Sequence, residues 1–367
     1  MQITKKVRGR TFGVAAAGLA ALAMAAPAPA QAQSLAGKTV EFVIPFAESG
    51  GSARWANFFA PLLSEALPGN PTVVVRYRPG GGSTTGANWF QEQTTNDGTL
   101  LFGTSGSTQF PYLLDDPLVR YEYNDWKVVL ASGTGGVVYV PADLGAKFDG
   151  DVDDLKDEPF LYGSQGATTL DLVPLLGFEL LGLSVDPVFG IEGRGDGRLM
   201  FERGEANIDY QTSSAYIRSV TPMVESGLAV PLFSWGALDA DGNIVRDPTF
   251  PDMPSFKEVC EATAGCETSG TAWDAFKAFF IAGFPAQKMV YLPGSASDDV
   301  VAMYTKAFND VIARPDFVAL SEKELGIYPQ LTGAGAQNAN DLATTVSPEA
   351  KEYVLNWLKD AYGVTMK

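Results

Sequence analysis

Two glycine-rich turns, each between an apolar strand-like run and a helical pattern, constrain this chain more than any other feature. The first turn, Ala47–Ser52, follows the run Val43–Phe46 and precedes a helical pattern from Ala53 to Leu67. The second follows Val73–Tyr77, contains Gly80–Gly82 and also precedes a helical pattern. A strand, a glycine turn and a helix start direct free backbone N–H groups and the positive end of the helix dipole toward one place. The pattern predicts an α/β fold that binds a negatively charged small molecule.

A third turn repeats this arrangement further along the chain. Residues Ser164–Thr169 connect the strand-like run Phe160–Gly163 to a helical pattern at Leu170–Leu180, and they carry several hydroxyl groups. Strand-like and helical patterns alternate here as in parallel sheets flanked by helices. The length favours two domains with a cleft between them. Ligands bind outside the carboxyl ends of strands in such folds. If the first and third turns belong to different domains, they would face each other across that cleft.

The N-terminal segment is predicted to be a secretory signal peptide covering residues 1–32. Four basic residues between Lys5 and Arg10 precede an apolar run, Val14–Ala26, and a small-residue cleavage site at Ala30–Ala32. The apolar run is shorter than the ~20 residues that span a bilayer, which disfavours a retained anchor. No cysteine lies directly after the cleavage site, so no lipid anchor is expected. We expect a periplasmic protein.

Composition excludes several partners and chemistries. Removal of the four basic residues takes the formal net charge from −17 to −21, and such an acidic chain is not expected to bind nucleic acid or anionic lipid. The chain has no histidine, which excludes Ser-His-Asp and Cys-His catalysis and the commonest zinc sites. No P-loop, Cys-x-x-Cys, EF-hand or Gly-x-Ser-x-Gly motif is present. We therefore expect no enzyme activity, metal or cofactor; the alternative is a secreted carboxylate-based hydrolase.

The two cysteines, Cys260 and Cys266, are candidates for a disulfide, because export places the chain in an oxidising compartment. Two free thiols are the alternative. The loop that a bridge would close is short, so its stabilisation is expected to be ~2–3 kcal/mol at most. It would stabilise the loop Glu258–Glu267 locally, with no catalytic role.

Six motifs follow one another in an order that resembles a known family. They are Ile44–Gly51, Arg78–Gly86, Asp97–Leu101, Tyr162–Gly166, Gly204–Asp209 and Phe250–Ser255. In this order they are similar to six segments of the extracytoplasmic solute-binding receptors of tripartite tricarboxylate transporters. Those segments are the Val-Pro-Phe…Gly-Gly loop, the Arg-Pro-Gly stretch, the Asp-Gly-Tyr-Thr-Leu segment, the second ligand loop, the Gly-Gly-x-Val-Asp segment and the Leu-Pro-Asp-Val-Pro-Thr segment. The resemblance to this family, the Bug or TctC-like family, extends from Lys38 to Val364.

The resemblance implies a receptor of the type II-like kind, with two Rossmann-like α/β domains joined by a hinge and a ligand cleft between them. Residues 38–140 and 270–367 are expected in domain 1, and residues 141–269 in domain 2. The receptor would capture a carboxylate-bearing small molecule, such as a dicarboxylate, a tricarboxylate or an aromatic acid. It would deliver this ligand, as a monomer, to the permease subunits of a tripartite tricarboxylate transporter. A sensory receptor for an organic acid is the alternative.

In that family two loops bind one carboxylate, largely through backbone N–H groups and ordered waters. The matching loops of this chain are Phe46–Ala53 and Ser164–Thr169. With neighbouring polar residues, the expected ligand-binding set is Phe46, Ala47, Glu48, Ser49, Gly50, Gly51, Ser52, Ala53, Arg54, Gly82, Ser105, Ser164, Gln165, Gly166, Ala167, Thr168, Thr169 and Asp209.

Two departures from the family pattern bear on the ligand. Ala53 stands where the family has an aspartate at the end of the first loop, which removes a polar contact. Thr168 stands where a glycine is usual, which narrows backbone freedom and adds a hydroxyl group. Glu48 also brings a negative charge next to the expected site. The ligand of a family member is therefore not transferred to this chain.

Several side chains have two interpretations. Arg54 is a candidate partner for a second ligand carboxylate, or else it is exposed or paired with Glu48. The turn that contains Arg194 and Arg198 either reaches into the cleft or is solvated.

Aromatic residues near the glycine turns, namely Phe46, Trp55 and Trp89, either line the pocket or belong to the core, and Phe46 is the strongest candidate because it lies in the loop itself. Asp209 is expected to bind either a polar ligand atom or a backbone N–H group.

Overall fold

The computed structural model of the chain describes residues 1–6, 9, 34–239 and 241–366. The apolar run and the cleavage site of the predicted signal peptide lie outside these residues. By its contacts the chain divides into one unit from Gln33 to Lys367 and another from Met1 to Ala32. Among the helices in the described ranges, none is both long enough and apolar enough to cross a membrane.

The largest sheet has six strands in the order β13-β4-β12-β3-β1-β2. Their bounds are β1 (Thr39–Ile44), β2 (Thr72–Tyr77), β3 (Leu100–Gly103), β4 (Lys127–Ser132), β12 (Lys288–Leu292) and β13 (Gln330–Leu331). Strand β1 runs parallel to β2 and β3, whereas β12 runs antiparallel to β3 and β4. Strand β12 comes from the C-terminal part of the chain, yet it lies between β3 and β4. This insertion brings its first residues beside the glycine turn that follows β1.

Three smaller sheets come from the middle of the chain. Strand β5 (Gly136–Pro141) lies between β8 (Asp209–Thr212) and β9 (Ala229–Ser234) and is antiparallel to both. Strand β6 (Phe160–Ser164) is parallel to β7 (Val185–Phe189), and a short hairpin joins β10 (Ala237–Leu238) and β11 (Ile244–Val245). The mixed α/β fold class is confirmed, but the expectation of parallel sheets is wrong for the strands β5 and β12. Alternation along the sequence does not reveal the direction in which a strand joins partners from a distant part of the chain.

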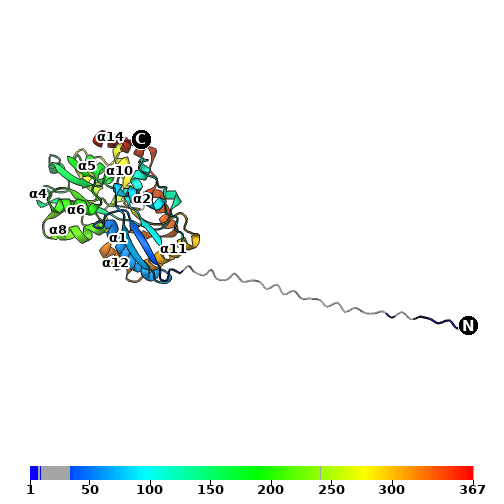
Figure 1. The fold of residues 1–367 in the computed structure, drawn as a ribbon. Coiled ribbons are helices and arrows are strands. Elements are labelled where there is room, and N and C mark those ends of the chain that lie inside the picture. The colour runs from blue at the N-terminus through cyan, green and yellow to red at the C-terminus, as the bar shows by residue number, and fades with distance from the viewer. Residues whose placement is uncertain (7–8, 10–33, 240, 367) are drawn as a thin grey trace. The chain divides into compact units, whose positions relative to one another are not determined.

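Helices cover these sheets (Figure 1). The helix bounds are α1 (Gly51–Ala66), α2 (Thr84–Gln91), α3 (Gly106–Leu113), α4 (Ala142–Gly145), α5 (Leu172–Leu180), α6 (Arg194–Glu202), α7 (Ser213–Ala215), α8 (Thr221–Glu225), α9 (Phe256–Ala262), α10 (Thr271–Gly283), α11 (Asp298–Ile312), α12 (Phe317–Glu324), α13 (Gly333–Ala343) and α14 (Pro348–Tyr362). Short 3-10 turns occur at Gly81–Ser83, Tyr123–Asp125 and Asp153–Leu155, and a π-helical turn at Tyr216–Val220. In Figure 1, helices α4, α6 and α8 lie with the smaller sheets, and α1, α11 and α12 with the large sheet.

The core follows from the alternation of side chains along each strand. In β1, the side chains of Phe42 and Ile44 are buried with Trp55 and Phe59 of α1 in one cluster. The intervening Val43 belongs to a second cluster with Phe102 and other aromatic residues. A third cluster, around Trp235 and Phe256, fills the space between the smaller sheets and helices α5 and α10. The first glycine turn therefore follows a strand, β1, that is fixed by packing on both faces.

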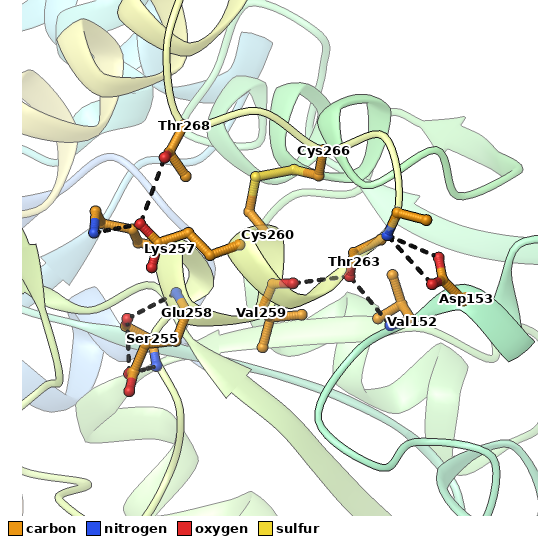
Figure 2. The surroundings of a disulfide bond; sticks show 12 residues. Val152, Asp153, Ser255, Lys257, Glu258, Val259, Cys260, Thr263, Cys266 and Thr268 are labelled. Atoms are coloured by element: carbon orange, nitrogen blue, oxygen red, sulfur yellow. Dashed lines mark hydrogen bonds and ion pairs between the residues drawn. A yellow bond between two sulfur atoms is a disulfide. The ribbon is translucent and has the colours of Figure 1, made fainter.

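The two cysteines form a disulfide with their Cα atoms 5.1 Å apart (Figure 2). Cys260 lies in α9, which begins with a capping box formed by Ser255 and Glu258. In the loop between the cysteines, Thr263 Oγ1 accepts a hydrogen bond from the backbone N–H of Val152 (3.2 Å). The next backbone N–H, that of Ala264, donates to the carboxylate of Asp153 (3.1 Å). The bridge thus closes a loop that is hydrogen-bonded to the segment before β6.

Candidate functional site

A small cavity lies where the starts of α1, α3 and α6 meet the turn after β6. Its volume is about 20 Å³, which is room for about one water molecule. The cavity is lined by Phe46, Gly50, Gly51, Ser52, Ser105, Ser107, Gln165, Leu170, Gly193, Arg194, Thr212, Gln287 and Lys288. Both loops expected from the sequence contribute to it, through Phe46 and Gly50–Ser52 on one side and Gln165 on the other.

The start of α1 provides free backbone donors. Gly50 precedes the helix in an extended conformation, no side chain caps the helix, and its first turn carries no acidic residue. The first N–H groups of a helix have no partner within it, and the positive end of the helix dipole adds to their effect. A Cβ atom on Gly51 would overlap the hydroxyl oxygen of Thr212, so glycine is required for this close approach.

The start of α6 lies directly against the start of α1. Gly193 precedes α6, again without a side-chain cap. A Cβ atom on Gly195 would lie 2.6 Å from the carbonyl oxygen of Ser49, and one on Gly50 would lie 3.7 Å from the backbone nitrogen of Gly195. Two uncapped helix starts thus approach each other through their backbones. Their positive ends repel each other, and an anion placed between them would be stabilised by both.

The turn after β6 uses most of its polar groups internally. The backbone N–H of Gln165 donates to Asp171 (2.7 Å), and that of Gly166 donates to the hydroxyl of Ser164 (3.2 Å). The hydroxyl of Thr169 donates to the carbonyl of Gly166 (2.7 Å). Of the expected residues Ser164 to Thr169, only Gln165 lines the cavity. Its Oε1 accepts a hydrogen bond from Ser107 (3.4 Å), and its Nε2 has no partner among the described residues.

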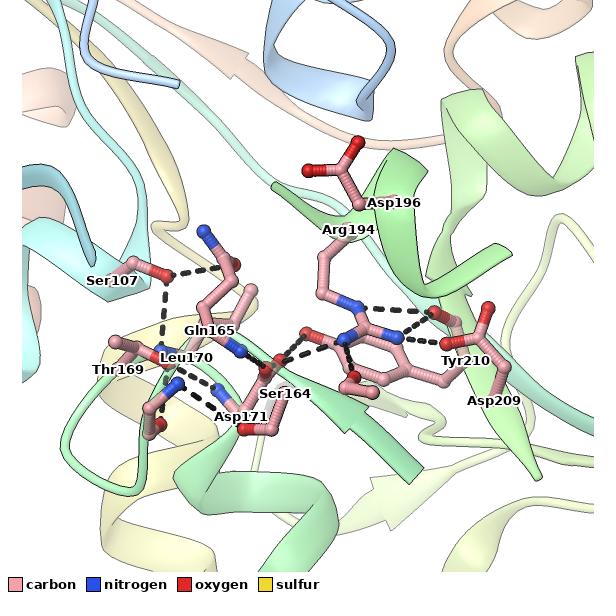
Figure 3. A network of polar contacts seen from close by, with 12 residues as sticks. Ser107, Ser164, Gln165, Thr169, Leu170, Asp171, Arg194, Asp196, Asp209 and Tyr210 are labelled. Atoms are coloured by element: carbon pink, nitrogen blue, oxygen red, sulfur yellow. Dashed lines mark hydrogen bonds and ion pairs between the residues drawn. The ribbon is translucent and has the colours of Figure 1, made fainter. Parts of the chain in front are cut away.

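Arg194 forms the centre of a buried polar network behind this turn (Figure 3). Its side chain pairs with Asp171 (3.3 Å) and with Asp209, and it donates to the carbonyls of Gly163 (2.5 Å) and Tyr210 (3.2 Å). Burial lowers the pKa of Arg194, but the two carboxylates outweigh this cost and hold the pKa well above its usual value. The alternative of a solvated turn is therefore wrong for Arg194. Arg194 is 6% exposed, and its guanidinium is hydrogen-bonded within the protein.

Asp209 does not appear among the residues that line the cavity. Its carboxylate accepts hydrogen bonds from Arg194, from the hydroxyl of Tyr139 and from Nε2 of Gln211 (2.9 Å). These are side-chain partners, whereas the sequence suggested a ligand atom or a backbone N–H group. In this position Asp209 fixes Arg194 and, through it, the start of α6.

The charged residues near the first loop face a different space. Nη2 of Arg54 donates to the hydroxyl of Ser219 (2.7 Å), and burial together with Arg218 and Arg198 lowers the pKa of Arg54. Arg54, Arg198 and Arg218 line a separate groove of about 570 Å³, together with Glu48 and Ser49. The charge of Glu48 is therefore directed to this groove and not to the cavity.

Of the remaining expected residues, Ser105 lines the cavity, whereas Gly82, Ala47 and Ala53 do not. The hydroxyl of Ser105 caps α3 by accepting from the backbone N–H of Ser107 (3.2 Å). Gly82 has a φ of 62° and would place a Cβ atom 2.6 Å from Cγ2 of Thr169, so this pair forms another close approach. Ala53 is buried within α1, and a Cβ atom on Gly193 would lie 3.6 Å from that of Ala47.

Of the three aromatic candidates, only Phe46 lines the cavity. Trp55 is buried in the core, where its Nε1 donates to Ser132 (3.0 Å). Trp89 lies under the guanidinium of Arg78, 4.0 Å from the ring centre.

Sequence analysis missed the residues that β12 brings to the cavity. Lys288 is 3% exposed, and its Nζ donates to the hydroxyl of Ser52 (3.3 Å). Burial lowers the pKa of Lys288 to about 7. Gln287 is fully buried, and neither atom of its amide has a partner among the described residues. The available signal was a polar pair directly before the apolar run Met289–Leu292.

Other cavity residues were missed because they lie on elements whose contacts are not evident from the sequence; they are Ser107, Leu170, Gly193 and Thr212. Within the described ranges, no group of three or more His, Cys, Asp or Glu side chains is arranged to hold a metal ion.

Comparisons with known proteins identify the fold. The chain matches no protein-family model and no curated protein sequence. Among solved structures it is similar to the periplasmic binding protein BugD, with 19% identity, a TM-score of 0.64 and coverage of 90% of this chain and 99% of that chain. It is also similar to Rhodopseudomonas palustris MatC with bound malate (16% identity, TM-score 0.62, 88% and 98% coverage) and R. palustris Rpa4515 with adipate (16%, 0.65, 89% and 98%). The chain therefore has the fold of a periplasmic binding protein over nearly its whole length, as the resemblance implied.

Proposed function

We propose that this protein is a periplasmic receptor that binds a carboxylate-bearing small molecule and delivers it to the permease subunits of a tripartite tricarboxylate-type transporter. The observation that carries the proposal is the meeting of the uncapped starts of α1 and α6 at one cavity. Such a place favours an anion, and a carboxylate is small enough to accept hydrogen bonds from several N–H groups at once. The ordered motifs and the periplasmic binding protein fold support the transport role.

The proposed domain 1 comprises residues 38–140 and 270–367, and domain 2 comprises residues 141–269. The large sheet takes its strands from the first set, and most strands of the smaller sheets come from the second. Strand β5 lies at the boundary between the two proposed domains. Most of its residues precede 141, but it pairs with β8 and β9 of domain 2. Two connections run side by side here, since the backbone N–H of Thr134 donates to the carbonyl of Phe284 (3.0 Å). We place the hinge at these connections.

In this proposal the ligand bridges the two domains and shifts the population toward the closed form. The close approach of Ser49 to Gly195 is then a contact made on closure. Ligand identity is narrowed by chemistry alone: the site suits a small organic acid. Malate and adipate, each present in one of the similar structures, are suitable first probes.

A thermal unfolding screen tests the proposal. The purified protein is heated with a panel of organic acids that includes malate, adipate, citrate and benzoate, and with their amides as controls. A ligand at 1,000 times its Kd adds ~4 kcal/mol to the stability of the native state, which raises Tm by several degrees. An acid that shifts Tm while its amide does not would support the proposal. Shifts by sugars, amino acids or metals, and by no acid, would contradict it.

The proposed receptor has no catalytic activity of its own. The absence of histidine from the chain supports this part of the proposal. A bound acid should be recovered unchanged after prolonged incubation with the protein, as measured by chromatography. Conversion of the acid into a product would favour a secreted hydrolase instead.

A further inference from the structure

Two buried polar residues at the start of β12, Gln287 and Lys288, face a cavity, and most of their polar groups have no hydrogen-bond partner among the described residues. Gln287 is fully buried and both atoms of its amide lack partners among the described residues. Lys288 is 3% exposed and has one hydrogen bond, to the hydroxyl of Ser52. Nε2 of Gln165 and Oγ1 of Thr212, which line the same cavity, also lack partners. Buried polar atoms are normally satisfied, so an unmatched group of this kind indicates that a polar molecule occupies the cavity.

The two cations in the cavity wall differ in their surroundings. Arg194 is paired with Asp171 and Asp209 and donates to two backbone carbonyls, so its charge is balanced within the protein. Lys288 has no acidic partner among the ion pairs of the described residues. A buried ammonium without a counter-charge costs several kcal/mol, and this cost is removed only by a partner of opposite charge or by loss of the proton.

The elements packed around Lys288 do not supply that partner. Ser132 of β4 lies opposite it in the sheet register, and Ser52 lies at the start of α1. The starts of α3 and α6 contribute Ser105, Ser107 and Arg194 to the wall, and the end of β8 contributes Thr212. Among the described residues that line the cavity, Arg194 is the only other charged one, and it carries the same sign. None of them balances Lys288, so the cost of its burial is removed either by an anion from outside the chain or by loss of its proton.

We propose that Lys288 is the charged partner of the ligand carboxylate, and that Gln287 beside it contacts the polar substituent next to that carboxylate. This inference rests on the proposed function and deepens it, because it assigns ligand selection to the start of β12. The helix starts of α1 and α6 bind an anion without distinguishing one acid from another. A fixed ammonium with an adjacent amide instead selects acids by the position of charge and of a hydrogen-bonding group.

Binding of a carboxylate should change the protonation state of Lys288. Lys288 has a pKa of about 7 in the protein without ligand, so it is largely neutral at pH 8. A carboxylate placed against it favours the charged form. Binding at pH 8 should therefore take up close to one proton per molecule of acid.

Isothermal titration calorimetry tests the inference with malate or adipate, whichever binds the wild type more tightly. Titrations at pH 8 in phosphate and in Tris buffers give the number of protons taken up. The variants are Lys288→Met, Lys288→Arg and, as a matched control, Lys306→Met, whose side chain is 74% exposed. We expect wild type and K306M to bind equally and to take up a proton. We expect K288M to bind at least ~30-fold more weakly, and K288R to bind within tenfold of wild type without proton uptake.

The outcomes separate the inference from the proposed function. If the wild type binds the acid but K288M binds within threefold of it and no proton is taken up, the role of Lys288 is wrong while the receptor function stands. If no acid binds the wild type, both fail. Thermal unfolding of each variant shows whether it is folded. If K288M does not fold, K288R, which keeps a fixed charge, still tests the inference through its affinity and its lack of proton uptake.

Discussion

At the scale of single residues, the partners of a buried charged group decide whether its charge is balanced within the protein. Arg194 and Lys288 are both buried cations in one cavity wall. The first has two carboxylate partners, and the second has none among the described residues. The desolvation cost of burying Arg194 is therefore offset by its ion pairs, whereas the same cost for Lys288 is not offset by an ion pair.

Lys288 should make the stability of the ligand-free protein depend on pH. Its pKa is about 7 in the folded chain and 10.5 when unperturbed. Between these values the unfolded chain binds more protons, so the free energy of unfolding rises with pH across this window, by a few kcal/mol in total. Below pH 7 the full cost is present. In urea denaturation, K288M should be more stable than wild type at pH 7, and the difference should shrink at pH 10. An equal difference at both pH values would contradict the buried lysine.

Replacement of Arg194 by methionine should be strongly destabilising. It leaves the carboxylates of Asp171 and Asp209 buried without their cation, which costs ~3–5 kcal/mol. Urea denaturation at neutral pH measures the loss. Arg203→Met is the matched control, because that arginine is 55% exposed and its pair with Glu205 is solvated. Equal stability of the two variants would show that the network around Arg194 does not support the fold.

At the scale of elements, the starts of α1 and α6 combine two functions. They supply uncapped N–H groups to one cavity, and they touch through Gly50 and Gly195. Glycine at these positions serves the close approach of two backbones, because neither residue has a positive φ. A substitution there acts on the contact and leaves the helix itself intact.

Gly195→Ala should separate folding from closure. Alanine favours a helix over glycine by about 1 kcal/mol, but its Cβ atom would lie 2.6 Å from the carbonyl oxygen of Ser49. We expect Tm to change little while the Kd for the acid rises at least ~10-fold, measured by calorimetry. Gly335→Ala is the control, since a Cβ atom there meets Leu331 at an ordinary 3.4 Å. Unchanged affinity of G195A would show that this contact has no part in binding.

Removal of the disulfide should weaken the fold and leave the cavity unaffected. The bridge closes a six-residue separation, so Cys260→Ser together with Cys266→Ser should cost ~2–3 kcal/mol in urea denaturation. The affinity for the acid should not change, because the bridge lies among α9 and the 152–153 segment (Figure 2). A large loss of affinity would mean that this loop reaches the site.

The elements that could be predicted from the sequence are those with a strong local pattern. The bounds of β2 and β6 agree within one residue with the strand-like runs Val73–Tyr77 and Phe160–Gly163, and α1 agrees within two residues with the helical pattern Ala53–Leu67. Strand β12 was missed because it begins with a lysine in a position where burial would not be expected. The antiparallel direction of β5 depends on partners about 70 and 90 residues away in the chain, which no local pattern contains.

For the site, the sequence predicted the residues whose role lies in their own backbone, such as Gly50 and Gly51. It could not predict Gly193 or Lys288, because their roles come from contacts between distant segments. It also placed Arg54 near the ligand, whereas the structure turns that side chain toward Ser219. Local chemistry was predictable, and the direction of long side chains was not.

At the scale of the whole molecule, the residues from Gln33 to Lys367 form one unit in which the cavity has room for about one water molecule. A carboxylate ligand needs more space than this. In the proposed mechanism, the ligand therefore enters an open form, and the connections at residues 133–135 and 284–287 are the axis about which the two domains move.

Small-angle X-ray scattering should detect this movement. In the proposed mechanism, a saturating acid decreases the radius of gyration of the wild type, because the ligand bridges both domains. G195A should show a smaller decrease at the same degree of saturation, since its added methyl group obstructs the contact with Ser49. An unchanged radius for the wild type with a verified, saturating ligand would exclude closure of the proposed kind.

The approach of Gly50 to Gly195 also bears on the use of this protein as a sensor. That contact is made by main-chain atoms, so in the proposed mechanism it does not depend on the side chains that select the acid. The side chains at the start of β12 can then be exchanged to change the analyte, while fluorophores attached on either side of the contact keep reporting the same movement. A single scaffold would serve as a set of biosensors for different organic acids.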